Sequence, residues 1–486
     1  MKRRPFLPAQ IGAACLGLAI AAAAPAWAFF RPDRALQVAT GITARTLCSE
    51  TFISGLNPAR VYSESLKPRG GFGLLGPWLH YRVNPQAKEV HADWGGLFHS
   101  RAVYRGAAGC QLWQGEGDVS SPPALKPFDA APDLPEIAGP TLVAPSDPAL
   151  VRALDRVFAE PASGRPRNVR AVVIVKDGRV VAERYAPGIG IDTPLFGYSM
   201  TKTVTSALVG VLVRDGQLRV DAPAPVSAWR GAGDPRGAIT VDNLLRMDSG
   251  LAAEETGSGF DPTSRMLYAE PDMADFAARS KLKHAPGAVW EYQSPNTLLL
   301  SKIIKDAVGG KEADALNFAR TVLFGPLGMR TAVFETDAAG TPVGSQSLLA
   351  SARDWAKFGQ LYLNDGMAGE RRILPVGWVA AARRSTLGSE YGAGLWINTS
   401  TSKNALARVT RDGMPSDAYY ASGDLGQRIY ILPGQKLVIV RMGATHQPGF
   451  DIQGDLRLIR EVMTATAAPH HHRNPNLTPT KPGQSI

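Results

Sequence analysis

Two β-hairpin patterns, one near each end of the segment 169–442, constrain the fold of this chain most strongly. The first surrounds Asp177-Gly178, and the second turns at Pro433-Gly434. An Asp-Gly pair between runs of β-branched residues is a strong local signal for a hairpin. The predicted strands are residues 169–175 and 179–185, and residues 427–432 and 437–442.

The chain between these hairpins has a mainly helical pattern, interrupted by loops rich in glycine and proline. We therefore expect an α+β fold, in which one antiparallel sheet is built from both ends of the domain and flanked by helices, with a large, mainly helical insertion between its halves. Helices are predicted at residues 150–158, 274–280, 297–308, 313–323, 352–363 and 376–385.

The tetrad Ser199-Met200-Thr201-Lys202 precedes the apolar stretch 203–213. Residues i and i+3 share one face of a helix, so Lys202 is expected beside the Ser199 hydroxyl. A serine hydroxyl becomes a strong nucleophile when a neighbouring base takes its proton, and a buried lysine with a lowered pKa can be that base. Because serine is also a favoured helix N-cap, the tetrad alone leaves a structural role open. Similar tetrads at 280–283 and 400–403 lie in polar stretches, and we interpret them as chance.

Residues 1–28 have the pattern of a secretory signal peptide. A basic start at residues 2–4 is followed by a small and apolar run at 11–24 and by the Ala-x-Ala site Ala26-Trp27-Ala28. We predict cleavage after Ala28 and a periplasmic or secreted mature protein without stable membrane insertion. No later stretch has the roughly 18 apolar residues of a spanning helix.

The mature chain would keep two cysteines, Cys48 and Cys110. An oxidising compartment favours a disulfide between them over two buried free thiols. Such a bond would fix the segment that precedes the main domain.

The formal net charge of +10 does not indicate a nucleic-acid site, because the basic residues outside the leader are dispersed along the chain. A solvated basic surface is the expected consequence. The sequence has no zinc-like spacing of His, Cys and carboxylate residues, and we expect neither a metal nor another cofactor.

Four segments are predicted: the signal peptide 1–28, an N-terminal extension 29–135, a main domain 136–465 and a disordered polar tail 466–486. The extension is rich in aromatic residues and has short β-like runs at 80–83 and 101–104, so we expect it to fold. Its glycine-rich stretch 71–76 does not follow a strand and is interpreted as a loop. The proline-rich residues 120–148 are predicted to be a linker or a wrapping segment. His470, His471 and His472 are expected in the solvated tail.

Residues 150–460 resemble the serine β-lactamase and penicillin-binding-protein superfamily, and within it the class C β-lactamase-related esterases and 6-aminohexanoate-dimer hydrolases. The segments that carry the resemblance, in the order of the family, are 198–202, 244–251, 292–296, 324–329, 354–359 and 421–423. The resemblance implies a β-lactamase/transpeptidase-like fold and a serine hydrolase that forms an acyl-enzyme.

The resemblance also implies roles for individual residues. Ser199 would be the nucleophile, Lys202 would share its proton, and Tyr292 would act as acid and base, with its phenolate favoured by the charge of Lys202. The backbone N–H groups of Ser199 and Asp424 would form the oxyanion hole. Further polar or backbone contacts to substrate are expected from Ser294, Asn296, Ser422 and Gly423, and Tyr419 and Tyr420 are candidates for lining the pocket.

One departure from the family pattern concerns substrate choice. Ala421 stands where penicillin-recognising enzymes usually carry a Lys or His that binds the substrate carboxylate. This favours a small-molecule ester or amide as substrate. Asp424 would repel an anionic substrate or bind an amine. A β-lactam- or peptidoglycan-recognising enzyme is one alternative, and an inactive binding protein on the same scaffold is another.

Overall fold

The computed structural model describes residues 31–113, 119, 121–128 and 130–467 of the 486-residue chain. The predicted signal peptide and the three histidines 470–472 lie outside these residues. Within the described ranges, no helix has both the length and the apolar character needed to cross a membrane.

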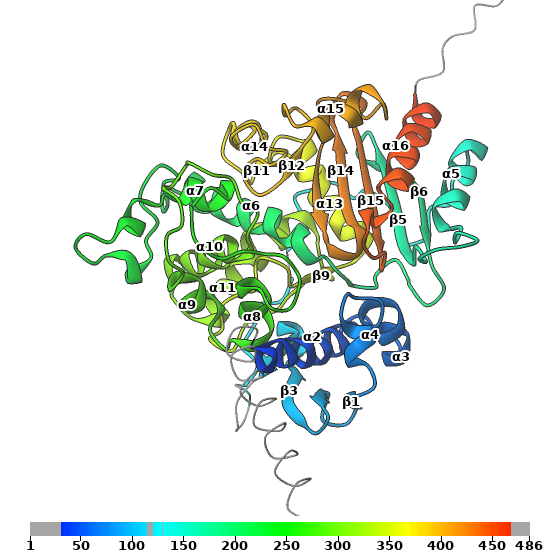
Figure 1. Cartoon of the computed structure of the whole chain (residues 1–486). Coiled ribbons are helices and arrows are strands. Elements are labelled where there is room, and N and C mark those ends of the chain that lie inside the picture. Colours follow the sequence, from blue (N-terminus) through cyan, green and yellow to red (C-terminus); the bar gives the residue numbers. More distant parts are fainter. Residues whose placement is uncertain (1–30, 114–118, 120, 129, 468–486) are drawn as a thin grey trace, which may run out of the picture.

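A six-stranded antiparallel sheet lies at the centre of the main domain, in the order β12-β13-β14-β15-β5-β6 (Figure 1). Its strands β5 and β15 are neighbours, with Ile174 opposite Ile439. The two hairpins therefore meet edge to edge, and the expected sheet built from both ends of the domain is confirmed. The strands are β5 (Val169–Lys176), β6 (Arg179–Tyr185), β12 (Trp396–Ile397), β13 (Tyr419–Gly423), β14 (Gln427–Leu432) and β15 (Leu437–Gly443).

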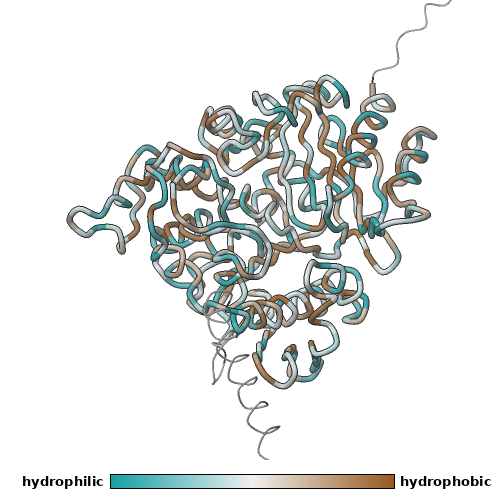
Figure 2. Tube along the Cα trace, in the orientation of Figure 1, coloured by the Kyte–Doolittle hydropathy of each residue, from teal (hydrophilic) through white to brown (hydrophobic). Residues whose placement is uncertain are grey.

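Both faces of this sheet are buried, and hydrophobic residues run along its strands (Figure 2). On β5, Val173 and Val175 join the core that includes residues of α6 and α13, whereas Val172 and Ile174 join the core under α5 and α16. Successive side chains of a strand point to opposite faces, so one run of apolar residues serves both cores. The four helices are α5 (Pro148–Phe158), α6 (Thr201–Arg214), α13 (Ala352–Leu363) and α16 (Ile452–Thr466).

The region between the hairpins is mainly helical, as predicted. Helix α13 has the predicted bounds, whereas the helix predicted at 313–323 ends at Ala319 and continues as the π-helical turn Arg320–Phe324. The other helices here are α7 (Val241–Arg246), α8 (Pro262–Ala269), α9 (Met273–Ala278), α10 (Ser294–Ala307), α11 (Glu312–Ala319), α12 (Gly325–Leu327), α14 (Trp378–Ala382) and α15 (Lys403–Thr410). Short strands are β7 (Leu195–Phe196), β8 (Val333–Phe334), β9 (Leu348–Ala350), β10 (Met367–Ala368) and β11 (Arg371–Arg372).

The N-terminal extension is folded, and its predicted β character is confirmed by a four-stranded antiparallel sheet. None of its three α-helices was expected, and α4 lies within the glycine-rich stretch that we interpreted as a loop. Its helices are α2 (Pro32–Phe52), α3 (Pro58–Val61) and α4 (Phe72–Leu75), and its strands are β1 (Leu79–Asn84), β2 (Glu89–Trp94), β3 (Leu97–Tyr104) and β4 (Cys110–Trp113).

Helix α2 lies between the small sheet and the main domain, so it has no continuous polar face. Thr40, Thr43 and Arg45 are buried in it together with its apolar residues. Gly41 allows α8 to approach closely, because a Cβ at this position would lie 2.0 Å from the carbonyl oxygen of Tyr268. This two-sided burial removed the 3.6-residue periodicity by which amphipathic helices are recognised.

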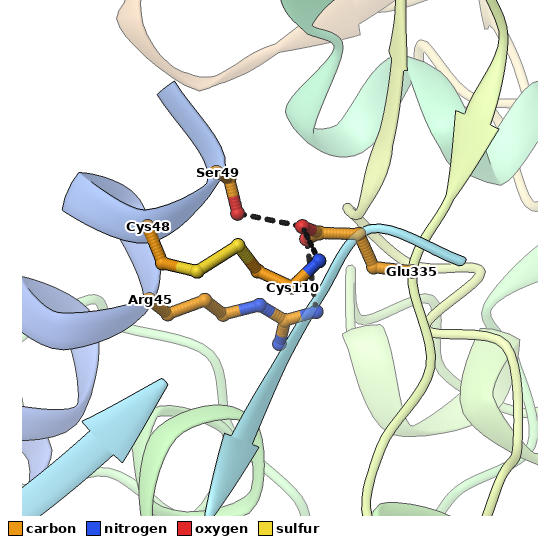
Figure 3. The surroundings of a disulfide bond; sticks show 5 residues. All are labelled: Arg45, Cys48, Ser49, Cys110 and Glu335. Carbon is orange, nitrogen blue, oxygen red and sulfur yellow. Dashed lines mark hydrogen bonds and ion pairs between the residues drawn. A yellow bond between two sulfur atoms is a disulfide. The ribbon is translucent and has the colours of Figure 1, made fainter. Parts of the chain in front are cut away.

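The predicted disulfide between Cys48 of α2 and Cys110 of β4 is confirmed (Figure 3). The buried carboxylate of Glu335, from the main domain, lies beside it. Glu335 accepts hydrogen bonds from Ser49 Oγ at 2.6 Å and from the Cys110 backbone N–H at 2.9 Å. Arg45 lies 3.5 Å from the same carboxylate. The disulfide of the extension and the contact between the extension and the main domain thus form one structural unit.

The proline-rich segment wraps around the main domain, which confirms the second of the two interpretations offered for it. The backbone N–H of Leu134 donates to the Pro326 carbonyl at 2.9 Å, and Ile137 accepts from the N–H of Val180 on β6 at 2.8 Å. Arg353 of α13 donates to the Gly139 carbonyl at 2.7 Å.

Candidate active site

The expected nucleophile lies in a strained turn directly before helix α6. Ser199 belongs to the 3₁₀ turn Tyr198–Met200, and Tyr198 has a φ of 45°. A bulky residue with positive φ persists where the surrounding structure imposes it, and such strain clusters at functional sites. Ser199 is partly exposed, whereas Tyr198 and Met200 are buried. The turn therefore presents one hydroxyl at the edge of a rigid core.

Lys202 contacts this hydroxyl, as the i,i+3 spacing predicted. Its Nζ donates to Ser199 Oγ at 2.9 Å, to Ser294 Oγ at 2.9 Å and to the Ser345 carbonyl oxygen at 3.1 Å. The residue is only 2% exposed. Within the described part of the chain, all three hydrogen-bond partners of this amine are neutral, and no carboxylate pairs with it.

The surroundings of Lys202 favour its uncharged form. Burial lowers the pKa of Lys202 below its usual value of 10.5, and the nearby acidic groups of Glu255 and Tyr268 only oppose this shift. A buried ammonium without a counter-ion carries a desolvation cost that deprotonation removes. The arrangement can therefore provide an amine that accepts the proton of Ser199.

Tyr292 lies in the loop before helix α10 and completes the group around the hydroxyl. Lys202 Nζ is 4.8 Å from the centroid of its ring, and Ser199 lies near enough to the phenol to affect its pKa. Burial raises the pKa of Tyr292 above its ordinary value of 10.0, and Glu255 adds to the rise, while the nearby Ser199 hydroxyl and the charge of Arg428 oppose it. The direction of this shift favours the protonated phenol over the phenolate that the resemblance implied.

Ser294 and Asn296 were both expected at the site, and the structure separates their positions. Ser294 is the first residue of α10 and contacts Lys202 directly. Asn296 is buried and accepts a hydrogen bond from Ser249 Oγ at 2.6 Å, while its amide nitrogen lies 3.5 Å from the Met247 sulfur. Asn296 thus ties α10 to the loop around Ser249, and no hydrogen bond among the described residues joins it to Ser199 or Lys202.

Strand β13 ends against the nucleophile turn. A Cβ at Gly423 would lie 2.3 Å from the Gly197 carbonyl oxygen and 3.2 Å from the Tyr198 Cβ, so only glycine fits at this point. Asp424 follows, with a partly exposed side chain, and Leu425 has a φ of 55°. The close approach brings the peptide between Gly423 and Asp424 beside the Ser199 turn, where the oxyanion hole was expected.

Two side chains of β14 bind the backbone here, Arg428 on the peptide between Gly423 and Asp424 and Gln427 on the peptide that follows it. Arg428 is buried and its Nη1 donates to the Gly423 carbonyl at 2.9 Å, while Gln427 Nε2 donates to the Asp424 carbonyl at 3.2 Å. A cation on a carbonyl polarises the peptide to which it belongs, and the N–H of that peptide is the one contributed by Asp424. Neither residue was recognised from the sequence, because neither lies in a family motif.

The remaining predicted positions on β13 differ in accessibility. Ser422 is partly exposed and lies opposite Arg428 in the strand register. Ala421 is buried. Strand β13, Tyr-Tyr-Ala-Ser-Gly, therefore carries no Lys or His at the position where the family motif places one. Tyr419 was a candidate for lining the pocket, but it is buried and donates its hydroxyl to the Tyr362 carbonyl at 2.9 Å.

Glu255 is a further group near the site that sequence reasoning missed. It is partly exposed, and its carboxylate accepts a hydrogen bond from the backbone N–H of Ser294 at 2.5 Å. Its negative charge acts on both Lys202 and Tyr292. No local pattern marks this residue, because it lies in an irregular loop after the Ser-Gly-Leu motif.

An aromatic cluster surrounds Tyr292. The centroid of the Tyr292 ring lies 5.4 Å from that of Trp396 and 5.6 Å from that of Tyr391. The ring centroids of Trp290 and Trp396 are 6.3 Å apart. Tyr420, a candidate for lining the pocket, stacks on Trp396 with 6.4 Å between the ring centroids and so belongs to this cluster. Trp290 and Trp396 remain partly exposed, which gives the site an apolar flank.

Comparisons with known proteins agree with this geometry. A protein-family model described as Beta-lactamase matches residues 154–464. The chain is 25% identical over 297 residues to the 6-aminohexanoate-dimer hydrolase of Paenarthrobacter ureafaciens, an alignment that covers 57% of this chain and 73% of the relative.

Two solved structures share the fold. A Bacillus anthracis protein assigned as a 6-aminohexanoate-dimer hydrolase superposes with a TM-score of 0.54 at 22% identity, over 70% of this chain and 90% of that one. A penicillin-binding-protein homologue from Caulobacter crescentus gives a TM-score of 0.51 at 18% identity, over 67% and 99%. Since the family model matches well over half of the sequence, the chain belongs to the β-lactamase family and is a serine hydrolase with the β-lactamase/transpeptidase-like fold.

Proposed function

We propose that this protein hydrolyses small-molecule esters or amides through an acyl-enzyme on Ser199. The observation that carries the proposal is the position of Lys202, which is buried, has a lowered pKa and is hydrogen-bonded to the Ser199 hydroxyl without a carboxylate partner among the described residues. A structural lysine would be expected to pair with an acid or to reach water. This one has the surroundings of a general base.

In the acylation step, the Lys202 amine takes the proton of Ser199 as Oγ attacks the substrate carbonyl. The oxyanion accepts hydrogen bonds from the backbone N–H groups of Ser199 and Asp424. The neutral Tyr292 phenol then gives its proton to the departing oxygen or nitrogen, and the Lys202 ammonium reprotonates Tyr292. This sequence needs a protonated phenol at rest, which is the state that burial of Tyr292 favours.

In the deacylation step, water attacks the acyl-enzyme and Lys202 accepts its proton. Departure of Ser199 Oγ from the second tetrahedral intermediate requires one proton, which the Lys202 ammonium at 2.9 Å can return. Serine and amine are then restored to their starting states, so the cycle balances.

The flanks of the site favour an ester or an amide with an apolar group over a β-lactam. Trp290 and Trp396 offer an apolar surface beside Tyr292. The strand position that would bind a β-lactam carboxylate holds the buried Ala421. The named relative, a 6-aminohexanoate-dimer hydrolase, supports an amide as one substrate class.

Export to the periplasm or the medium is part of the proposal. The disulfide between Cys48 and Cys110 supports it, because such bonds persist in oxidising compartments. The predicted cleavage after Ala28 supplies the route.

Labelling with a fluorophosphonate probe, followed by peptide mapping, tests the proposal. We expect one modified residue, Ser199, and complete loss of label in Ser199→Ala. Ser280→Ala, in one of the other Ser-x-x-Lys tetrads, is the matched control and should label as the wild type does. A folded wild-type protein that neither takes up the probe nor turns over p-nitrophenyl acetate would contradict the proposal and favour a binding protein. Turnover of nitrocefin in preference to esters and amides would favour the β-lactam alternative.

A further inference from the structure

The N-terminal extension contributes a charged residue to the edge of the candidate site. Arg69 lies between the π-helical turn Tyr62–Leu66 and helix α4, and its Nη1 forms an ion pair with Asp424 Oδ2 at 2.9 Å. Its guanidinium is 5.9 Å from the ring of Tyr198, the residue before the nucleophile. The family match begins only at residue 154, so this contact comes from outside the matched region.

The segment that carries Arg69 is firmly held. Arg69 Nε donates to the Ser65 carbonyl at 2.9 Å. Ser65 Oγ accepts from the buried Arg170 at 3.0 Å, and Arg170 also pairs with Glu50 of α2 at 2.9 Å. The His446 ring, which follows β15, lies 2.6 Å from the Glu64 carbonyl oxygen. The guanidinium is therefore fixed relative to both the central sheet and the extension.

The negative charge of Asp424 would repel the proposed oxyanion, and the positive charge of Arg69 can offset it. The N–H of Asp424 is one of the two proposed oxyanion donors, yet its own side chain is a carboxylate. A fixed negative charge close to a developing oxyanion raises the barrier to acylation, because like charges repel most strongly where water is excluded. A cation paired with that carboxylate offsets the repulsion and also fixes the side chain of the donor residue.

We propose that Arg69 is a positioning residue of the hydrolytic site, which neutralises Asp424 and thereby permits an oxyanion to form beside it. The proposal rests on the hydrolase function proposed above. It assigns a function to the extension: the extension supplies a cation to the β13 edge of the site, where the sequence motif has none. It also predicts that the intact site disfavours cationic substrates, because the carboxylate that would attract them is already paired.

A double-mutant cycle tests this proposal. For a neutral p-nitrophenyl ester, we expect Arg69→Gln to lower kcat on the order of tenfold with little change in KM. Asp424→Asn alone should lower kcat by less than Arg69→Gln does, because it removes the repulsion together with the need for the cation. The double variant should recover most of the activity lost in Arg69→Gln. Arg101→Gln, which removes an ion pair with Glu89 elsewhere in the extension, is the matched control and should retain wild-type kinetics.

The cycle distinguishes a charge effect from a structural one. A double variant as slow as Arg69→Gln would overturn the proposal, since loss of folding or of loop order would not be rescued by a second substitution. Unchanged kcat in Arg69→Gln would overturn it as well. As a second readout, Arg69→Gln should gain activity on an ester with a trimethylammonium group relative to a neutral ester of equal length, and an unchanged ratio would count against the proposal. Wild-type labelling of Ser199 by the fluorophosphonate shows in the same samples whether the underlying hydrolase function holds.

Discussion

The buried basic side chains of the candidate site and of the junction between the extension and the main domain differ in whether they have an acidic partner. At the junction, each buried arginine has an acidic partner: Arg170 pairs with Glu50 at 2.9 Å, and Arg105 pairs with Glu312 at 2.7 Å. At the site, Lys202 is as deeply buried, but among the described residues its hydrogen-bond partners are two hydroxyls and a carbonyl. Paired charges hold the extension and the main domain together, whereas the amine without an acidic partner is left with a lowered pKa, so that it can lose a proton and then act as a base.

Removal of the Lys202 amine should have the largest effect. We expect Lys202→Met to lower kcat/KM for esters by about 10³-fold or more, because the general base is lost. Stability should not fall, since a buried ammonium is replaced by an apolar side chain of similar length. The gain in the free energy of unfolding of the variant over the wild type should be largest at pH values below the lowered pKa of Lys202, because the wild type must bury a charge there. The gain should shrink as pH rises toward 10.5. Steady-state kinetics and urea unfolding at several pH values measure both effects.

The second change breaks an ion pair at the junction. Arg170→Met should lower the free energy of unfolding by about 3–5 kcal/mol, because the buried carboxylate of Glu50 loses its partner. The companion change Glu50→Gln in the double variant should recover part of that loss. Chemical denaturation is the measurement. A variant of unchanged stability would show that the junction charges contribute little to cohesion and would erase the contrast with Lys202.

A smaller change sharpens the account of the site itself. The charge of Glu255 raises the pKa values of both Lys202 and Tyr292. Glu255→Gln keeps an acceptor for the Ser294 N–H but removes the charge, so the rising limb of the kcat/KM against pH profile should move to lower pH. Glu254→Gln, whose exposed carboxylate pairs with Lys283 at 3.3 Å, is the control and should leave the limb in place. A shift in the opposite direction would show that Glu255 does not act through these groups.

The parts of the molecule that the sequence predicted depend on local patterns. The hairpins follow from turn residues between β-branched runs, and the contact between Ser199 and Lys202 follows from helical spacing alone. Helix α2 was missed because it is buried on several sides and mixes Thr40 and Arg45 with its apolar residues.

The residues missed at the site depend on contacts between distant segments. Arg69, Glu255 and Arg428 lie on three elements that only the tertiary fold brings together, and none stands in a motif. Ser294 and Asn296 were both candidates from one motif, and only the fold shows that Ser294 binds Lys202 whereas Asn296 binds Ser249. A motif identifies which residues a family places together, but it does not state which way each side chain points.

The central claim is that an unpaired, buried Lys202 activates Ser199, and the pH dependence of Ser199 labelling tests it most directly. The rate of fluorophosphonate labelling should rise with pH through a single ionisation below 10.5, the usual pKa of lysine. In Lys202→Met the rate should be low and should lose this ionisation. A wild-type labelling rate that does not change with pH, or the same ionisation retained in Lys202→Met, would contradict the account.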